Sequence, residues 1–310
     1  MFSCKSRFCN SCSKPASDKW LNNIVARRPK WLLYHHFTFT IPTTLRIFFK
    51  TYRWALDILI QTAARSITYF CEKHKKCKPW IIAVIHTFWA RLNRNTHIHI
   101  VLTAWWITKD WKYKKIDYFP YKPIKASRKG YLLKNLTERV NQNLDWERRH
   151  NEIRELQHLS NQTNDVWEKL WRYVQFSQQY ESFTRVISYI GRYLKRPVIA
   201  QSRIKNYDWE TVTYTYEDKR ENKAVKEITV GVQEFIWLLI QHIPNQWFKM
   251  VRYYWAFCSR TKKQNLKILK WIFQKHDEPH LQVAHYFRQR LFNLTWVDIW
   301  ACRCWWCYLK

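Results

Sequence analysis

Alternating and helically spaced apolar positions predict a mixture of strands and helices in the first third of the chain. Residues 36–41 alternate apolar and polar side chains, a pattern typical of a strand. Residues 43–71 carry apolar side chains three and four positions apart, which predicts one helix. Runs rich in Ile and Val predict buried strands at residues 80–87 and 96–103, joined by a hairpin turn at residues 93–95.

The rest of the chain continues this mixture. A basic, aromatic and proline-bearing connection is expected at residues 109–129, exposed and able to contact a phosphate backbone. A charged amphipathic helix or helix pair is expected over residues 131–159. Further expected strands are residues 172–177, 198–203 and 211–216, and further expected helices are residues 181–194 and 233–242. Strands joined mostly by hairpins, with helices between them, predict an α+β fold with an antiparallel sheet.

The charge of the chain indicates what kind of partner the protein binds. Lys and Arg number 54 against 23 acidic residues, which gives a formal net charge of +31. Such an excess predicts a polyanionic partner, most simply nucleic acid, and salt-dependent binding. The apolar runs are too short to span a membrane, and the first residues carry cysteines where a signal peptide has an apolar core. Nine cysteines in such a protein predict a reducing, cytoplasmic and nucleoid-associated location.

The balance of glycine and tryptophan is unusual. Glycine occurs 3 times and tryptophan 20 times, whereas average usage predicts about 22 glycines in such a chain. We hypothesise that many of the tryptophans are glycines decoded with the wrong genetic code, for example from a UGA codon read as Trp. If the suspect codons in the gene are all UGG, this hypothesis is excluded. The alternative is real aromatic enrichment for base stacking. Suspect positions where a turn would favour glycine are Trp105, Trp106, Trp209, Trp255, Trp305 and Trp306.

Two histidines form a candidate metal site. His97 and His99 stand two positions apart in a predicted strand, so both imidazoles point to one side of the sheet. The alternating Ile98 and Ile100 would face the core. Two histidines leave a metal ion undercoordinated, so a third ligand is expected. His86, on the predicted neighbouring strand, is the candidate, and its alternative role is a core histidine. These residues predict a site for a divalent metal ion.

Two tyrosines form a candidate nucleophile pair. Tyr189 and Tyr193 stand four apart in a predicted helix and therefore share one face. Attack on a phosphodiester by either would leave a 5′-phosphotyrosine and a free 3′-hydroxyl, with a divalent ion polarising the phosphate. A second tyrosine lets one site make two successive cleavages. Cations nearby are candidate phosphate contacts and favour the ionised phenol: Arg185, Arg192, Lys195 and Arg196.

These motifs, in this order, resemble the two-tyrosine HUH transposases of the insertion-sequence-91 family, whose elements move by rolling-circle transposition. The resemblance runs along nearly the whole chain. Its blocks are residues 4–12 (CKSRFCNSC), 36–42 (HFTFTIP), 82–88 (IAVIHTF), 95–100 (NTHIHI), 189–196 (YIGRYLKR), 202–204 (SRI), 207–208 (YD), 251–254 (VRYY) and 259–260 (SR).

The resemblance implies a fold and an activity. It implies a zinc-binding head at residues 1–30, an HUH nuclease core at residues 31–205 and a basic DNA-gripping region at residues 206–310. His97 and His99 take the positions of the ligands to Mg²⁺ or Mn²⁺, and Tyr189 and Tyr193 take the nucleophile positions. The implied activity is metal-dependent nicking and rejoining of single-stranded DNA at the ends of a mobile element.

Two departures from the family stand out. Trp89, Trp209 and Trp255 replace residues that are usually glycine in the family, which independently favours the miscoding hypothesis. The N-terminal head holds Cys4, Cys9 and Cys12, and three cysteines make an incomplete tetrahedral zinc site. The family usually carries a further Cys pair upstream, so we favour a truncated start. The alternatives are completion of the zinc site by His35 or His36, or zinc shared with another chain.

Three other functions remain open at the level of sequence. A catalytically inactive remnant would bind DNA without forming a metal-dependent adduct. A rolling-circle replication initiator or relaxase would share the same chemistry. A basic RNA-binding structural protein would make the paired His and paired Tyr accidental, so replacing His97 and His99 would change no activity.

Overall fold

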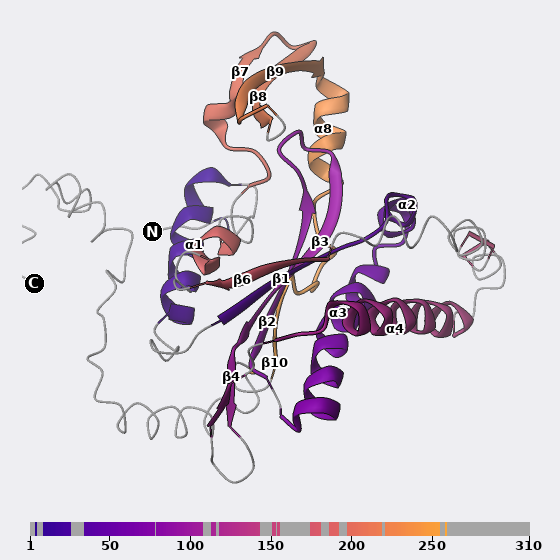
Figure 1. Cartoon of the computed structure of the whole chain (residues 1–310). Helices are drawn as coiled ribbons and strands as arrows, with labels where there is room; N and C mark the ends of the chain where they lie inside the picture. The colour runs from indigo at the N-terminus through magenta and orange to yellow at the C-terminus, as the bar shows by residue number, and fades with distance from the viewer. Residues whose placement is uncertain are drawn as a thin grey trace, which may run out of the picture.

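The computed structural model describes residues 4, 9–25, 34–77, 79–107, 113–115, 118–142, 151–152, 154–155, 174–180, 186–191, 197–218, 221–254 and 258. A five-stranded antiparallel sheet forms the centre of this part of the chain, with helices on both of its faces (Figure 1). A smaller three-stranded sheet lies at one end. The predicted α+β class with an antiparallel sheet is therefore confirmed.

The central sheet joins strands from distant parts of the chain. Its order is β10-β2-β3-β1-β6, so only β2 and β3 are neighbours both in sequence and in the sheet. The strands are β1 (Tyr34–Thr40), β2 (Ile81–Phe88), β3 (Arg94–Thr103), β6 (Val174–Tyr180) and β10 (Val251–Tyr254). Because β10 pairs with β2, the region after residue 205 contributes an edge strand to this sheet.

One face of the sheet is covered by three helices. They are α2 (Thr43–Thr51), α3 (Ala55–Phe70) and α4 (Tyr121–Asn141). Alternate strand residues, among them Phe37 and Ile98, enter the larger core on this face together with the apolar sides of these helices. The period of two along each strand sends the intervening residues to the opposite face.

The opposite face carries both apolar and polar side chains. Its smaller core contains Ile82, Val84 and Val101 from the sheet and Ile187 from the helical residues 186–191. Helix α1 (Asn10–Val25) lies on this side (Figure 1). Further along the same face, His86 follows Val84 on β2, and His97 and His99 precede Val101 on β3. These histidines therefore lie beside the helices that pack on this face.

The small sheet packs on the tip of the β2–β3 hairpin. It consists of β7 (Ile204–Tyr207), β8 (Thr211–Asp218) and β9 (Ala224–Gly231), with α8 (Val232–Ile240) following. Phe88 and Leu92 of the hairpin share a core with Tyr214 and Phe235. The Arg203 guanidinium donates to the carbonyl oxygens of Thr215 and Ala90, at 2.7 and 2.6 Å, and so joins the two units.

Shorter elements complete the described structure. A two-stranded sheet joins β4 (Trp105–Ile107) to β5 (Tyr113–Lys115). A π-helical turn (Cys71–Lys75) continues α3 and ends at Lys76 in the left-handed region, and a 3-10 turn (Gln201–Arg203) precedes β7. None of the described helices is both long enough and apolar enough to cross a bilayer.

Several predicted elements differ from the structure. The single helix expected at residues 43–71 is two helices, because the chain turns at residues 52–54. The hairpin turn lies at residues 89–93, and Asn95 belongs to β3. Residues 198–203 form a bend and a 3-10 turn, so the predicted strand there is wrong.

The basic connection predicted at residues 109–129 is also partly wrong. Its last part, residues 121–129, is the beginning of α4, and Arg128 is fully buried. Pro123 lies in the first turn of this helix, where the missing amide hydrogen costs no intrahelical bond. Pro123 therefore belongs to the start of a helix, whereas the sequence pattern predicted a connection at this position.

Candidate metal centre and nucleophile

Three histidines meet on the polar part of the sheet. His86 of β2 pairs directly with His97 of β3, and His99 stands two residues further on the same face. One ring nitrogen from each of the three lies within 4.8 Å of the others. His86 and His99 are buried, while His97 is half-buried. The predicted pair and the candidate third ligand are thus brought together by strand pairing.

Hydrogen bonds at the Nδ1 atoms orient two of these rings. Nδ1 of His97 lies 2.7 Å from the Asn95 carbonyl oxygen. A carbonyl only accepts, so this Nδ1 carries the proton and Nε2 of His97 keeps its lone pair. Nδ1 of His99 lies 2.8 Å from Nε2 of His36 and 3.2 Å from Oγ1 of Thr38. The donor set therefore fits a divalent ion that accepts imidazole ligands.

Burial keeps the neighbouring histidine neutral. His36 is 8 % exposed, and desolvation lowers its pKa to about 4. A neutral ring can share a single hydrogen with His99, whereas two imidazolium rings would repel each other.

Tyr189 lies beside this cluster. Its ring centroid is 6.0 Å from that of His99, and the two rings are nearly perpendicular. The helical residues 186–191 hold it there, because Val186, Ile187 and Ile190 pack into the core on this face of the sheet. One predicted nucleophile is thus adjacent to the predicted metal ligands. The other predicted site residues of this segment lie outside the described residues: Tyr193, Arg185, Arg192, Lys195 and Arg196.

Helix α1 is packed tightly against the helical residues 186–191, the tyrosine-bearing helix. A Cβ built at Gly191 would lie 3.0 Å from the Trp20 ring, and the Ser17 hydroxyl donates to the Gly191 carbonyl oxygen at 3.0 Å. The Trp20 indole N–H in turn donates to the Tyr253 hydroxyl at 2.6 Å. The position of Tyr189 therefore depends on the N-terminal helix and on strand β10.

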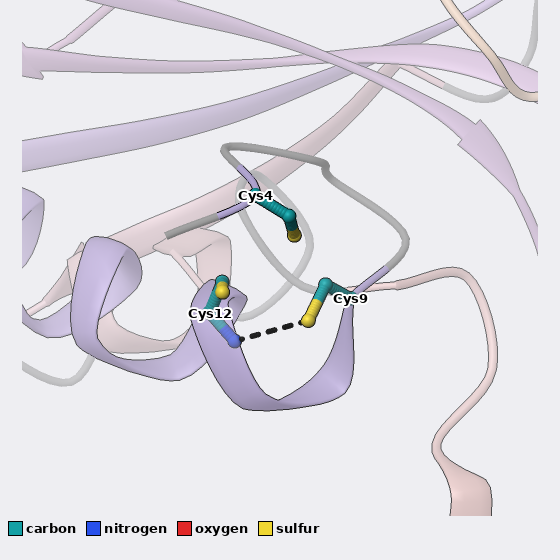
Figure 2. A group of neighbouring side chains, drawn as sticks. All are labelled: Cys4, Cys9 and Cys12. Carbon is teal, nitrogen blue, oxygen red and sulfur yellow. Dashed lines mark hydrogen bonds between the residues drawn. The ribbon is translucent and has the colours of Figure 1, made fainter. Parts of the chain in front are cut away.

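The N-terminal cysteines form a second candidate metal site. The sulfur atoms of Cys4, Cys9 and Cys12 lie within 4.8 Å of one another (Figure 2). The backbone N–H of Cys12 donates to the sulfur of Cys9 at 3.4 Å. Three thiolates suit zinc, which takes four ligands in structural sites. The predicted partial site is therefore assembled by the start of α1.

Neither His35 nor His36 completes the cysteine cluster. His36 is hydrogen-bonded to His99, and the ring of His35 packs edge-on against Phe119 at 5.0 Å between centroids. The suggestion that one of these histidines is the fourth zinc ligand is therefore wrong. Their strand, β1, points them to opposite faces of the central sheet.

Two residues that contact the histidine cluster, His36 and Thr38, were not predicted to lie there. His36 and Thr38 alternate on the predicted strand at residues 36–41, so their common face was visible in the sequence. Their partner strand was not, because β1 pairs with β3 about sixty residues later, with Thr38 opposite His99.

Comparisons with known proteins agree with these motifs. A family model described as "Putative transposase" matches residues 81–265, and one described as "Transposase zinc-binding domain" matches residues 1–41. The chain is 29 % identical over 280 residues to the transposase for insertion sequence element IS801 of Pseudomonas savastanoi pv. phaseolicola, covering 85 % of this chain and 63 % of that protein. It is 24 % identical over 275 residues to the putative transposase y4qJ of Sinorhizobium fredii (strain NBRC 101917 / NGR234), covering 85 % and 68 %. The chain thus spans roughly two thirds of the length of each relative. No solved structure matches the chain significantly.

Proposed function

The chain belongs to the transposase family whose model covers residues 81–265, and we propose that it nicks and rejoins single-stranded DNA at the ends of a mobile element. The observation that carries this proposal is the contact between the Tyr189 ring and His99 at the edge of the histidine cluster. A phenolic nucleophile beside a candidate metal site supplies the two groups that metal-assisted covalent cleavage of a phosphodiester uses. The net charge of +31 suits a DNA substrate.

The cleavage step forms one bond and breaks another. The phenolic oxygen of Tyr189 bonds to phosphorus while the bond between phosphorus and the 3′ oxygen breaks. The phenol loses its proton and the departing 3′ oxygen gains one, which leaves a 5′-phosphotyrosine and a 3′-hydroxyl. Attack by a 3′-hydroxyl on the phosphotyrosine reverses these changes and rejoins the strand. Tyr193 is the proposed nucleophile for the second cleavage.

The ligands of the divalent ion are assigned to three side chains. Nε2 of His86, of His97 and of His99 would hold Mg²⁺ or Mn²⁺. A divalent ion held there supplies Lewis-acid polarisation of the scissile phosphate. The chain itself contributes orientation, because the Asn95 carbonyl fixes the His97 ring and the packed residues 186–191 hold Tyr189.

Other parts of the chain have supporting roles in this proposal. Cys4, Cys9 and Cys12 would hold zinc in a head at residues 1–30, and residues 206–310 would help to grip DNA next to the core at residues 31–205. The proposed site of action is the cytoplasm, at the nucleoid. The proposed phosphate contacts are Arg185, Arg192, Lys195 and Arg196.

An SDS-stable adduct assay tests the proposed chemistry. The protein is mixed with 5′- and 3′-labelled single-stranded DNA that carries the element's ends, in Mn²⁺ or in EDTA. We expect a covalent adduct in Mn²⁺ only, lost in the Tyr189→Phe, Tyr193→Phe double variant and in His97→Ala, His99→Ala. His74→Ala is the matched control, because His74 lies in the exposed π-helical turn after α3 and should leave the adduct unchanged.

The outcomes separate the remaining candidates. An adduct that survives in the double tyrosine variant would refute the assigned nucleophiles. DNA binding without any adduct would identify an inactive remnant. Cleavage without joining of one element end to the other would favour a replication initiator or relaxase.

A further inference from the structure

His36 contacts the histidine cluster without being assigned as a ligand. It lies on β1, whose register places Thr38 directly opposite His99 and His36 opposite Val101. Its ring lies edge to edge with that of His99 in nearly the same plane, with centroids 5.0 Å apart and planes inclined by 19°. Nε2 of His36 is 2.8 Å from Nδ1 of His99, a full-strength hydrogen bond between two buried rings.

The direction of this bond decides what His99 can do. If Nδ1 of His99 carries the hydrogen and donates it to His36, Nε2 of His99 keeps its lone pair. If His36 donates instead, the hydrogen of neutral His99 resides on Nε2, which then cannot bind a cation. The two tautomers of the pair thus correspond to a competent and an incompetent ligand.

We propose that His36 is a positioning residue, which accepts the Nδ1 hydrogen of His99 and so presents Nε2 of His99 to the divalent ion. This inference rests on the proposed metal site and adds a residue to it. His36 takes for His99 the role that the Asn95 carbonyl takes for His97, at a nearly equal distance of 2.8 against 2.7 Å. Thr38 is a weaker second acceptor at 3.2 Å. Hydrogen-bond acceptors behind histidine ligands fix the tautomer and ring orientation in metal sites.

The first test measures Mn²⁺ affinity of the DNA-free protein by the electron paramagnetic resonance signal of unbound Mn²⁺. His36→Leu removes the acceptor and should weaken binding about 10- to 100-fold, the usual loss when such a partner is removed. His36→Gln places an amide oxygen near the position of Nε2 and should stay within about threefold of the unmodified protein. Equal affinity in His36→Leu and the unmodified protein would overturn the proposal, as would equal losses in both variants.

The matched control is the preceding residue of the same strand. His35 is equally buried but points to the opposite face, where it packs on Phe119. His35→Leu should leave Mn²⁺ affinity unchanged. A loss equal to that of His36→Leu would mean that any change in β1 disturbs the site, and the specific role of His36 would fall.

A second measurement uses the unmodified protein and so does not depend on the folding of any variant. ¹⁵N–¹H spectra of histidine-labelled protein report which ring nitrogen carries the hydrogen. We expect His99, assigned by its loss in His99→Gln, to be protonated at Nδ1. Protonation at Nε2 would overturn the proposal.

The Mn²⁺ affinity measurement also separates this inference from the proposed function. Mn²⁺ binding that is lost in His97→Ala but unaffected in His36→Leu would leave the metal site standing and remove only His36. An unmodified protein without Mn²⁺ binding would overturn both.

Discussion

Two tryptophans occupy a backbone conformation that suits glycine. Trp209 and Trp247 have φ values of 73° and 66°, and their side chains are 82 % and 89 % exposed. Trp209 sits in the β7–β8 turn, where the Asp208 carboxylate accepts hydrogen bonds from the backbone N–H groups of Glu210 and Thr211. The left-handed region costs an L-residue about 1–2 kcal/mol and costs glycine nothing comparable. Trp209 was suspected from the sequence, and its backbone now supports the miscoding hypothesis.

Trp209→Gly is therefore expected to stabilise the protein. Relief of the left-handed strain outweighs the lost ring contact with Tyr207 at 5.1 Å and the greater freedom of the unfolded chain, for a net gain of about 0.5–1 kcal/mol. Urea unfolding followed by circular dichroism measures the change. Trp89→Gly is the control, because Trp89 is 52 % exposed without a positive φ. A gain of the same size at Trp89, or a loss at Trp209, would contradict the backbone argument.

Residue-level reasoning from the sequence predicted that His97 and His99 lie together, because strand periodicity alone places them on one face. His86 followed from the expected hairpin, since neighbouring strands pair in a simple register. His36 could not be predicted, because its contact with His99 depends on a pairing between strands about sixty residues apart. Local patterns specify which face a residue occupies but not which strand lies next to it.

At the scale of elements, the N-terminal helix and the tyrosine-bearing helix act as one layer. The bare Gly191 backbone lets the Trp20 ring approach, and the Ser17 hydroxyl caps the Gly191 carbonyl. The cysteine cluster is located at the start of the same α1 helix. Zinc at the cysteines would thus order a helix that supports the proposed nucleophile.

Gly191→Ala should reduce adduct formation without removing metal binding. The added Cβ would lie 3.0 Å from the Trp20 ring, whose N–H is held by Tyr253, so α1 or the tyrosine-bearing helix must shift. We expect about a tenfold or greater loss in the rate of adduct formation, as expected when a nucleophile is displaced by a fraction of an ångström. Mn²⁺ affinity should be unchanged.

Gly130→Ala is the control for this prediction. Gly130 lies in α4, and a Cβ there meets no neighbouring atom within 4 Å. Its adduct rate should match that of the unmodified protein. An unaltered rate in Gly191→Ala would show that the close packing of α1 is irrelevant to catalysis.

Element prediction succeeded where burial followed a simple period and failed where tertiary contacts intervened. Strands β1, β2, β3 and β8 and helix α8 lie close to their expected positions. The break between α2 and α3 escaped detection because Tyr52 and Leu56 continue the helical apolar spacing and pack on the same core. Arg128 looked like a surface cation, yet it is buried in α4, donates to the Thr40 carbonyl and lies over the Phe39 ring.

For the whole molecule, the sheet order determines how the site is built. Strands β2 and β3 lie inside the sheet, and the β3 histidines have β2 on one side and β1 on the other. Strand β10 closes one edge from the far end of the described chain, and its Tyr253 reaches Trp20 of α1. This long-range closure could not be predicted from the sequence, because no local pattern encodes it.

The net charge of the whole chain predicts how it should bind DNA. Each phosphate neutralised on a single strand contributes about −0.7 to the slope of log K against log salt. If six phosphates are engaged, raising salt from about 50 to about 200 mM should weaken binding roughly 300-fold. Fluorescence anisotropy with a labelled single strand measures this. The Tyr189→Phe, Tyr193→Phe double variant should show the same slope, because removing two hydroxyl groups changes no charge. A slope near zero would mean that aromatic stacking, and not the excess of 54 cations over 23 anions, holds the DNA.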